Sequence, residues 1–443
     1  MLDVTYRMQI PHRPGQLSRV TGVISTHNGL IGDILTIHLG RERTERELTV
    51  EMPDLTAAAA LAKDLDAIDG VSVLWHLDRA FLRHEGGKLR IDPVVPVTTP
   101  QQMRDVYTPG VARVCTAIAH DDSLASRYTM IGTTVAVCTN GTRVLGLGDI
   151  GPRAAMPVME GKALFYKQFA GINAMPILID TKDEDEFVET VLRIAGGFAG
   201  IHLEDISAPS CFEIERRLLA ALPQPVMHDD VHGTAVVTVA AAIAACRHVD
   251  RRLDAAVVGQ IGLGAAGFGI ASLMHDGGAA RVIAYDPDEG SHARARAHGI
   301  EIVSMDELLD QADVVVATTG RAGLIKPEQV KKDSVMLALT NPVAEIDPDI
   351  ALAAGAAFAA DGRSVNNVLG YPGIFRGALL AGAPFISTKM KLAAAWAIAA
   401  LAPDGELVPD VLEQSVHTAV AEAVRAAAVE EGISRPDHIP PGL

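Results

Sequence analysis

The chain has 443 residues, of which 38 are basic and 55 acidic, giving a formal net charge of −17. At roughly 100–200 residues per domain this length predicts several folded domains. A composition of 49% hydrophobic and 21% charged residues is that of ordinary globular proteins and excludes extended disorder and fibrous repeats. The acidic balance also disfavours nucleic acids and anionic membrane surfaces as partners, because both carry negative charge.

The first residues show no sign of a targeting segment. The opening MLDVTYRMQIPHRPG lacks the basic and then apolar layout of a secretion signal. The Ala-rich run at 392–401 is far shorter than the roughly 20 residues that cross a bilayer. We therefore expect a cytoplasmic protein that has neither membrane nor nucleic acid as a partner.

Residues 1–78 predict a small α+β domain. The run VTYRMQI alternates between polar and apolar residues, as a strand with one buried face does. The full set of elements has the order β-α-β-β-α-β, which is the ferredoxin-like arrangement. The other predicted strands are LIGDILTIHL, ERELTVEM and VSVLWHL, and the predicted helices cover 16–26 and 55–68.

Three further blocks follow a polar linker predicted at 79–91, which contains Gly86-Gly87. Residues 92–222 are expected to form an α/β substrate domain with an apolar strand, MPILID, and a hairpin in TVAVCTNGTRVLGLG that turns at Asn140-Gly141. In 223–387 strands alternate with helices, which predicts a Rossmann-type parallel sheet covered on both faces. The Ala-rich block 388–443 is expected to consist of helices that pack on the catalytic domains.

Two Gly-x-Gly-x-x-Gly motifs occur in the chain. The motif at 146–151 is followed by Pro152 and Pro157 and by no strand that ends in an acid at the right distance, so we interpret it as a structural turn. The motif at 262–267 follows the strand AAVVGQI and opens a helix, and the next strand RVIAYD ends in Asp286. This second context is typical of a dinucleotide site.

Each position of the second motif has a physical role in such a site. The first glycine makes a tight turn, the second lets the backbone approach a pyrophosphate, and the third allows close helix packing, while the helix start offers free N–H groups. Asp286 lies 24 residues after Gly262, where an acid would accept the ribose hydroxyls and repel a 2′-phosphate. We therefore predict NAD, with NADP disfavoured, although Arg294 and Arg296 could weaken that preference. The predicted cofactor-binding residues are Gly262, Leu263, Gly264, Ala265, Ala266, Gly267 and Asp286.

Two pairs of acids stand among apolar neighbours. They are Glu204-Asp205, in FAGIHLEDISAPS, and Asp229-Asp230, after PQPVMH. Adjacent carboxylates in such surroundings repel each other and have raised pKa values unless a cation keeps them ionised. Oxygen ligands of this kind suit Mg²⁺ or Mn²⁺. Solvated loop acids and a helix N-cap are the alternatives that the sequence leaves open.

Lys162 and Tyr107 are candidates for proton transfer. Lys162 opens an apolar helical run in PVMEGKALFY, so burial would lower its pKa towards the range of a general base. The alternative for this lysine is a surface position at a helix start. Tyr107, in VYTPGVA, has a half-buried core position as its alternative.

From about residue 92 to the C-terminus, the ordered motifs closely resemble those of the malic enzymes, in particular the shorter bacterial type. The motifs are YTPGVA, LGLGDIGP, PVMEGKALFYKQFAGI, LEDI, HDDVHGTA, the dinucleotide motif, TNP and NNVLGYPG. This resemblance implies oxidative decarboxylation of malate to pyruvate and CO2, with a nicotinamide cofactor and Mg²⁺ or Mn²⁺. Glu204, Asp205 and Asp230 then match the family's metal ligands. Lys162 and Tyr107 match its base and acid.

The implied chemistry gives each residue a task. A chelating dication makes the hydroxyl of malate more acidic, and Lys162, or a relay through Asp229, removes that proton as hydride leaves. The metal then stabilises the enolate formed as CO2 departs, and Tyr107 protonates the enolate carbon. Arg143 resembles an arginine that holds a malate carboxylate in larger relatives. Asn341 resembles a residue at the nicotinamide, and Asn367, with Asn366 as a weaker candidate, resembles one at the substrate carboxylate.

The first block resembles an ACT domain, with PHRPGQLSRVTGVISTHNGLIGDI providing the strand, Pro-Gly turn, helix, glycine and second strand of that family. Such domains pair edge to edge and bind amino acids or similar small ligands near the turn. The resemblance therefore implies regulation by a small effector, or else a purely oligomerising role, and a homodimer or higher oligomer. The candidate effector contacts are His12, Gly15 and Gln16.

Two other functions remain open at the level of the sequence. One is a metal-independent amino-acid dehydrogenase, which also joins a substrate domain to a Rossmann domain. The other is a non-catalytic ligand-sensing protein whose catalytic block has decayed. Dependence of turnover on metal and on Lys162 distinguishes these alternatives from a malic enzyme.

Overall fold

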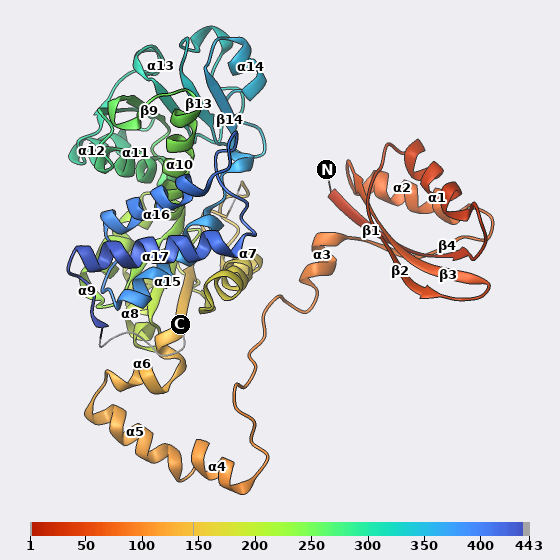
Figure 1. Cartoon of the computed structure of the whole chain (residues 1–443), viewed down its shortest axis with the longest axis horizontal. Coiled ribbons are helices and arrows are strands. Elements are labelled where there is room, and N and C mark those ends of the chain that lie inside the picture. The colour runs from red at the N-terminus through yellow and green to blue at the C-terminus, as the bar shows by residue number, and fades with distance from the viewer. Residues whose placement is uncertain (1, 145, 437–443) are drawn as a thin grey trace. The chain divides into compact units, whose positions relative to one another are not determined.

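The computed structural model describes residues 2–144 and 146–436 and divides into two compact units, Met1–Ile91 and Asp92–Leu443. The first unit contains the antiparallel sheet β2-β3-β1-β4, drawn in red and orange in Figure 1. The predicted ferredoxin-like order is therefore confirmed. Its elements are β1 (Leu2–Pro11), α1 (Gln16–Thr26), β2 (Leu30–Leu39), β3 (Arg43–Met52), α2 (Leu55–Asp66) and β4 (Ser72–Asp78).

Apolar side chains at alternate positions of β1 and β3 form the core of this unit. Val4, Tyr6 and Met8 on β1 and Leu48 and Val50 on β3 are fully buried against the helices, as period-2 side chains on one face of a sheet should be. The stretch predicted as a linker begins with a short helix, α3 (Arg79–His84), in which Arg79 forms an ion pair of 2.9 Å with Asp33 of β2.

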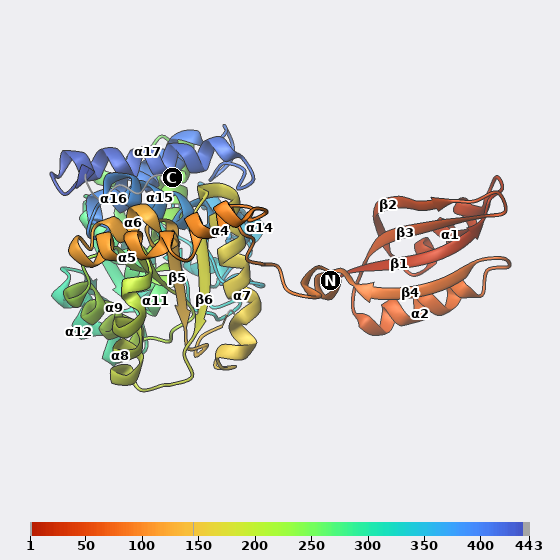
Figure 2. The same cartoon turned by 90° about the horizontal axis from the view of Figure 1, so that it is seen from below.

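The first sheet of the second unit is a four-stranded parallel sheet of order β6-β5-β7-β8. The helix α7 lies on one side of this sheet, and α8 and α9 lie on the other (Figure 2). The strands are β5 (Thr134–Thr139), β6 (Asn173–Leu178), β7 (Gly200–Leu203) and β8 (Val226–His228), and the helices are α7 (Pro152–Phe165), α8 (Glu184–Ile194) and α9 (Ser210–Ala221).

The predicted hairpin at Asn140-Gly141 is wrong. β5 pairs in parallel with β6 on one edge and β7 on the other, so neither edge is free for a returning strand. All six residues of β5 are buried, which is typical of a central parallel strand. Among the described residues after Gly141, strand pairing is limited to an isolated bridge between Val144 and Gly148 before α7 starts at Pro152, so the first glycine motif is a turn, as predicted.

A second parallel sheet has the order β11-β10-β9-β12-β13-β14, the Rossmann arrangement, and confirms the predicted fold class. Its strands are β9 (Val257–Ile261), β10 (Arg281–Tyr285), β11 (Glu301–Ile302), β12 (Val314–Ala317), β13 (Val335–Ala338) and β14 (Phe358–Asp361). The associated helices are α11 (Ala265–Asp276), α12 (Glu289–Ala297), α13 (Met305–Gln311) and α14 (Pro348–Ala353).

The helix α10 (Asp229–His248) runs through the second unit between its two sheets (Figure 1). By length and composition alone it could cross a membrane, but 83% of its most apolar window is buried, and a core helix of a folded protein passes the same test. Around it pack α11 and α16 (Thr388–Leu401), while α15 (Tyr371–Ala381) packs on α17 (Gln414–Glu430). The final helices thus pack on the rest of the second unit, and residues 437–443 lie outside the described residues.

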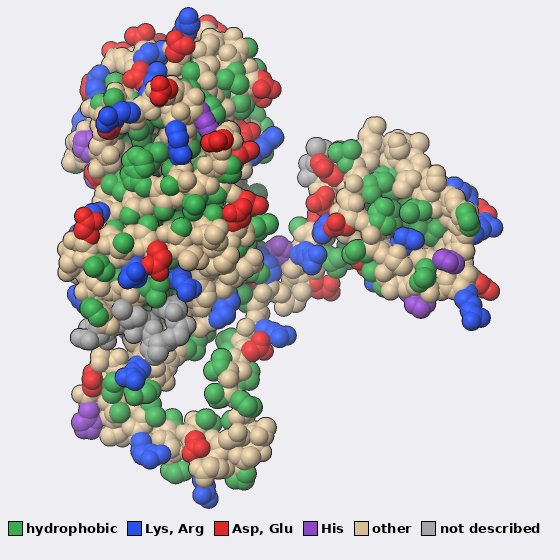
Figure 3. Space-filling model, viewed as in Figure 1, with side chains coloured by type: hydrophobic (Ala, Val, Ile, Leu, Met, Phe, Trp, Pro, Cys, Tyr) green, Lys and Arg blue, Asp and Glu red, His purple; other side chains and the backbone are tan. Residues whose placement is uncertain are grey.

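An arm of three short helices precedes β5. It consists of α4 (Pro100–Val106), α5 (Gly110–His120) and α6 (Leu124–Tyr128), which make their main contacts with one another and with the turn before β5. Hydrophobic side chains lie exposed along this arm (Figure 3), among them Met103 and Val106.

Candidate active site

Lys162 occupies the last turn of α7 and is buried. Its Nζ lies 2.5 Å from Oδ2 of Asp229 and 3.0 Å from Oε1 of Glu204. The ring of Tyr371, at the start of α15, lies 4.6 Å from the same Nζ. A single ammonium group therefore sits between two buried carboxylates and an aromatic face.

The four acids meet because β7 and β8 are neighbouring parallel strands. Glu204 and Asp205 follow the end of β7, and Asp229 and Asp230 follow the end of β8, so both pairs lie at the same edge of the sheet. Asp205 has a φ of 54°, an uncommon backbone conformation for a residue with a side chain. Its N–H donates to Oδ2 of Asp230 at 2.9 Å, which ties the two loops together.

Carboxylate oxygens of Glu204, Asp205 and Asp230 lie within 4.8 Å of one another. Glu204 and Asp205 are buried, whereas the side chain of Asp230 is 31% exposed, so the group has one side open to solvent. Three hard oxygen donors with an open side fit the preferences of Mg²⁺ and Mn²⁺.

The electrostatics of the cluster correct one prediction. Burial lowers the pKa of Lys162, but the carboxylates of Asp229 and Glu204 raise it by more, so the pKa of this lysine is well above its usual value and the predicted lowering is wrong. Burial likewise raises the pKa values of Glu204 and Asp229, which Lys162 partly offsets. Burial and the neighbouring Glu204 raise the pKa of Asp230 to about 6.

The sequence analysis missed His202 and Tyr166, whose side chains hold Glu204 in this cluster. His202 is fully buried, and its Nε2 lies 2.7 Å from Oε2 of Glu204 while its Nδ1 lies 2.9 Å from the hydroxyl of Tyr166. Burial lowers the pKa of His202 to about 3, so the ring is neutral and links Glu204 to Tyr166. The signal was present in the sequence, because residues two apart on a strand, such as His202 and Glu204, point to one face.

The second glycine motif lines a cleft of about 350 Å³ at the carboxyl edge of the Rossmann sheet. A Cβ on Gly267 would meet the carbonyl oxygen of Gly262 at 1.9 Å, whereas a Cβ on Gly264 would meet nothing within 4 Å. Gly262 has a φ of 93°, which a side chain would strain. Gly264 lines the cleft, and no side chain caps the start of α11 there, so the first N–H groups of this helix have no capping partner. Leu263, Ala265 and Ala266 lie in the same loop and first turn.

Asp286 lies in this cleft with both of its oxygens engaged. Oδ2 accepts from the N–H of Leu263 at 2.6 Å and Oδ1 from the N–H of Asp288 at 2.8 Å. Arg294 is held elsewhere, since its guanidinium stacks 3.9 Å from the ring of Phe212 and donates to the carbonyl oxygen of Leu263 at 3.2 Å. Arg294 therefore stabilises the glycine loop through the carbonyl oxygen of Leu263.

The remaining predicted residues fall in different places. Asn367 joins the cluster, because its Nδ2 donates to Oδ2 of Asp229 at 2.7 Å. Asn366 accepts from the N–H of Val368 at 3.0 Å, and Asn341 donates to the carbonyl oxygen of Gly362 at 3.3 Å. Arg143 lines the dinucleotide cleft, and its N–H donates to the carbonyl oxygen of Asp205 at 3.1 Å.

Tyr107 is not brought to the cluster. It ends α4 on the arm, is 67% exposed, and its side chain has no hydrogen bond or ring contact within the described residues. The sequence motif that carries this tyrosine gives no information about the direction of the arm.

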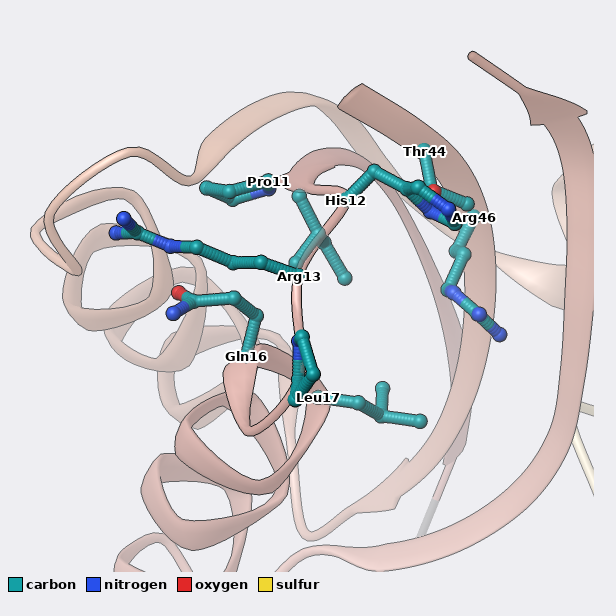
Figure 4. Close-up of a pocket in the computed structure, with 9 residues that line it drawn as sticks. Pro11, His12, Arg13, Gln16, Leu17, Thr44 and Arg46 are labelled. Atoms are coloured by element: carbon teal, nitrogen blue, oxygen red, sulfur yellow. The ribbon is translucent and has the colours of Figure 1, made fainter. Parts of the chain in front are cut away.

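The N-terminal unit has a separate pocket of about 340 Å³ between the turn after β1, the start of α1 and the start of β3 (Figure 4). His12 Nδ1 lies 2.8 Å from Oγ1 of Thr44, and Arg46 extends along the same side, while Arg13 and Gln16 lie beside each other on the other side. Two predicted effector contacts thus line this pocket. Gly15, the third, has a φ of 83° and precedes α1 without a side-chain cap. The full lining is Ile10, Pro11, His12, Arg13, Pro14, Gln16, Leu17, Thr44 and Arg46.

Two family models match the chain between residues 87 and 324. The model described as "Malic enzyme, N-terminal domain" matches residues 87–219. The model described as "D-isomer specific 2-hydroxyacid dehydrogenase, NAD binding domain" matches residues 235–324. The two matches fall on the first and second parallel sheets, respectively.

Proteins of known identity match over most of the chain. NAD-dependent malic enzyme 1 of Bacillus subtilis (strain 168) is 48% identical over 427 residues, which cover 96% of this chain and 97% of that relative. The NAD-dependent malic enzyme of Geobacillus stearothermophilus is 41% identical and aligns with 100% of this chain and 97% of its own length.

Among solved structures, the NAD-dependent malic enzyme from Thermotoga maritima superposes with a TM-score of 0.73 at 36% identity, covering 79% of this chain and 99% of that chain. The malic enzyme from Pyrococcus horikoshii gives a TM-score of 0.74 at 37% identity, covering 79% and 88%. The chain therefore belongs to the malic enzyme family.

Proposed function

We propose that this enzyme oxidises and decarboxylates malate to pyruvate and CO2, with reduction of NAD and with dependence on Mg²⁺ or Mn²⁺. The observation that carries the proposal is the convergence of Glu204, Asp205 and Asp230 within 4.8 Å of one another, beside a buried Lys162. The names of the relatives support the substrate and the coenzyme.

The residues present fit both groups that the reaction needs. The three carboxylates would hold the dication, and the open space at Gly264 would admit a pyrophosphate. When bound, NAD would accept hydride from the carbinol carbon, and the dication would acidify the substrate hydroxyl and stabilise the enolate. Asp286 would accept the ribose hydroxyls and disfavour a 2′-phosphate.

Lys162 and Asp229 would handle the first proton. Asp229 is fully buried, and burial raises its pKa, while the two carboxylates keep the proton on Lys162. Lys162 therefore acts as the base only after its proton has passed across the 2.5 Å contact to Asp229, which serves as the relay. Lys162 then takes the substrate hydroxyl proton. Asn367 donates to the same oxygen of Asp229 and holds that carboxylate in place.

The second proton, delivered to the enolate carbon, is assigned to Tyr107 by the family motif. Tyr107 lies on the arm and is exposed, so this role requires that the arm bring it to a site. That site is either its own or that of a neighbouring subunit. Arg143 and Asn366 are proposed contacts of the substrate, and Asn341 of the nicotinamide.

Steady-state assays of the purified full chain test the proposal. We expect malate-dependent reduction of NAD that exceeds that of NADP, that is abolished by exhaustive EDTA, and that returns on addition of Mn²⁺. Activity on malate that survives EDTA would contradict the metal-based mechanism and favour a metal-independent amino-acid dehydrogenase. Absence of turnover under all conditions would favour a non-catalytic ligand sensor.

We also propose that the first unit is an ACT-like regulatory domain and that its pocket binds the effector. Arg13 and Arg46 line the pocket, neither guanidinium has a hydrogen bond or ion pair within the described residues, and the lining contains no carboxylate. An amino acid's ammonium group would find no counter-charge there. The pocket therefore favours a small organic di- or tricarboxylate over an amino acid.

Replacing Arg46 by alanine is expected to weaken the response to such an acid at least about tenfold, since a charged hydrogen bond is worth about 1.5–3 kcal/mol. The measurement is malate saturation at increasing concentrations of di- and tricarboxylic acids and of amino acids. Arg41→Ala, at an exposed turn of the same unit, is the matched control. An unchanged response in Arg46→Ala would place the effector elsewhere.

The exposed edge strand β2 bears on the oligomeric state. We propose a homodimer or higher oligomer that works in the cytoplasm. All ten residues of the edge strand β2 are exposed, including Leu30, Leu35 and Leu39, and a free apolar edge is suited to pairing with another copy.

A further inference from the structure

Glu215, on α9, lies beside the segment that carries Asp229 and Asp230. Its side chain is 7% exposed, and both of its oxygens are engaged. Oε1 accepts from the N–H of His228 at 2.7 Å, and Oε2 lies 3.0 Å from Nε2 of His232. One carboxylate thus bridges the end of β8 and the first turn of α10, on either side of the two aspartates.

A lysine from the C-terminal helices determines whether His232 donates or accepts in its hydrogen bond with Glu215. Nζ of Lys391, on α16, lies 3.0 Å from Nδ1 of His232. A lysine ammonium can only donate, so Nδ1 of His232 accepts. The imidazole proton is then on Nε2, which donates to Glu215. Glu215, His232 and Lys391 form a directed chain of hydrogen bonds that links α9, α10 and α16.

Glu215 is negatively charged, as an acceptor of two hydrogen bonds should be. Burial raises its pKa, but His232 and Lys391 lower it by more, to about 2, so the carboxylate is ionised and accepts on both oxygens. The turn is also confined by packing from another side, because a Cβ on Gly269 of α11 would meet the carbonyl oxygen of Val231 at 2.1 Å.

We infer that Glu215 is a positioning residue, which holds Asp229 and Asp230 in register through its bonds to His228 and His232. The inference rests on the proposed function, in which Asp230 binds the dication and Asp229 relays the proton. Glu215 itself touches neither. Residues that orient metal ligands in this way typically contribute about 10- to 100-fold to metal affinity.

Glu215→Gln tests the inference, because glutamine keeps the shape and replaces one acceptor by a donor. If the amide oxygen accepts from His228, the amide N–H groups face the protonated Nε2 of His232; if the amide flips, they face the N–H of His228. Either orientation opposes two donors. We expect the Mn²⁺ affinity of the full chain, measured by titration calorimetry without NAD, to fall about 10- to 100-fold. We expect kcat to fall with it and the KM for NAD to remain unchanged.

A second substitution distinguishes positioning from a simple loss of charge. Lys391→Met removes the donor at Nδ1, so the imidazole proton can move there and Nε2 can accept from the glutamine. The double variant Glu215→Gln, Lys391→Met is therefore expected to bind Mn²⁺ more tightly than Glu215→Gln alone. A loss of negative charge as the only cause predicts that Lys391→Met raises Mn²⁺ affinity by the same factor in the wild type and in Glu215→Gln, whereas positioning predicts a larger gain in Glu215→Gln.

Controls separate the outcomes. Glu213→Gln alters an acid on the same helix that is 42% exposed and pairs with Arg216, and it is expected to bind Mn²⁺ as the wild type does. If Glu215→Gln does not fold, His232→Leu, which retains the bond from His228, is expected to lose affinity in the same direction. A wild-type chain that binds no Mn²⁺ would overturn the proposed function. Wild-type affinity in Glu215→Gln, or an equal gain from Lys391→Met in the wild type and in Glu215→Gln, would overturn this inference instead.

Discussion

Lys162→Arg is expected to lower kcat for malate oxidation about 10²- to 10⁴-fold, the range contributed by a general base. Arginine retains the positive charge between Asp229 and Glu204, but its guanidinium stays protonated in proteins and so cannot accept the substrate proton. Turnover with malate and NAD and the thermal unfolding temperature are measured together. A folded but inactive protein is the expected result.

Two comparisons make this test specific. Lys162→Met removes the charge as well, leaves two buried carboxylates without a cation, and is expected to unfold at a lower temperature than Lys162→Arg. Lys182→Met, at a lysine that is 73% exposed and pairs with Asp149, should behave as the wild type does. Wild-type turnover in Lys162→Arg would show that another group is the base.

Gly267→Ala is expected to destabilise the fold and weaken NAD binding at least about 100-fold, since backbone clashes of this kind belong to the most severe substitutions. The new Cβ would meet the carbonyl oxygen of Gly262 at 1.9 Å, so the start of α11 would have to move away from β9. The measurements are the thermal unfolding temperature without ligand and NAD affinity by fluorescence titration.

Gly264→Ala separates the effect on NAD binding from the effect on stability. Its Cβ has no neighbour within 4 Å, so the unfolding temperature should stay at the wild-type value, while the methyl group occupies the space proposed for the pyrophosphate. NAD affinity is therefore expected to fall without loss of stability. Unchanged NAD binding in Gly264→Ala would show that the pyrophosphate does not approach this backbone.

Local signals in the sequence predicted much of this molecule. The ferredoxin-like order of the first unit followed from strand alternation, and the Rossmann sheet followed from alternating strands and helices with a glycine motif in a suitable context. The juxtaposition of Glu204 with Asp230 followed the rule that parallel strand ends share an edge, although the sequence analysis obtained it from a family resemblance.

The failures have a common physical origin, which is that they depend on neighbours distant in the chain. Asn140-Gly141 has the local chemistry of a hairpin turn, but β6 and β7 already pair with both edges of β5. The pKa of Lys162 is decided by two acids that lie 42 and 67 residues further along the chain. Strand spacing already places His202 on the face of Glu204, whereas Glu215 contacts the acid-bearing segment from a different helix, and only coordinates reveal that contact.

The close approach of α10 and α11 has a consequence for the geometry of the reaction. Gly269 allows the two helices to touch backbone to backbone at Val231. One helix begins at the acids and the other begins at the glycine loop. Main-chain packing rather than side-chain rotamers therefore fixes how far the acids lie from the glycine loop, the two places where substrate and coenzyme are proposed to bind.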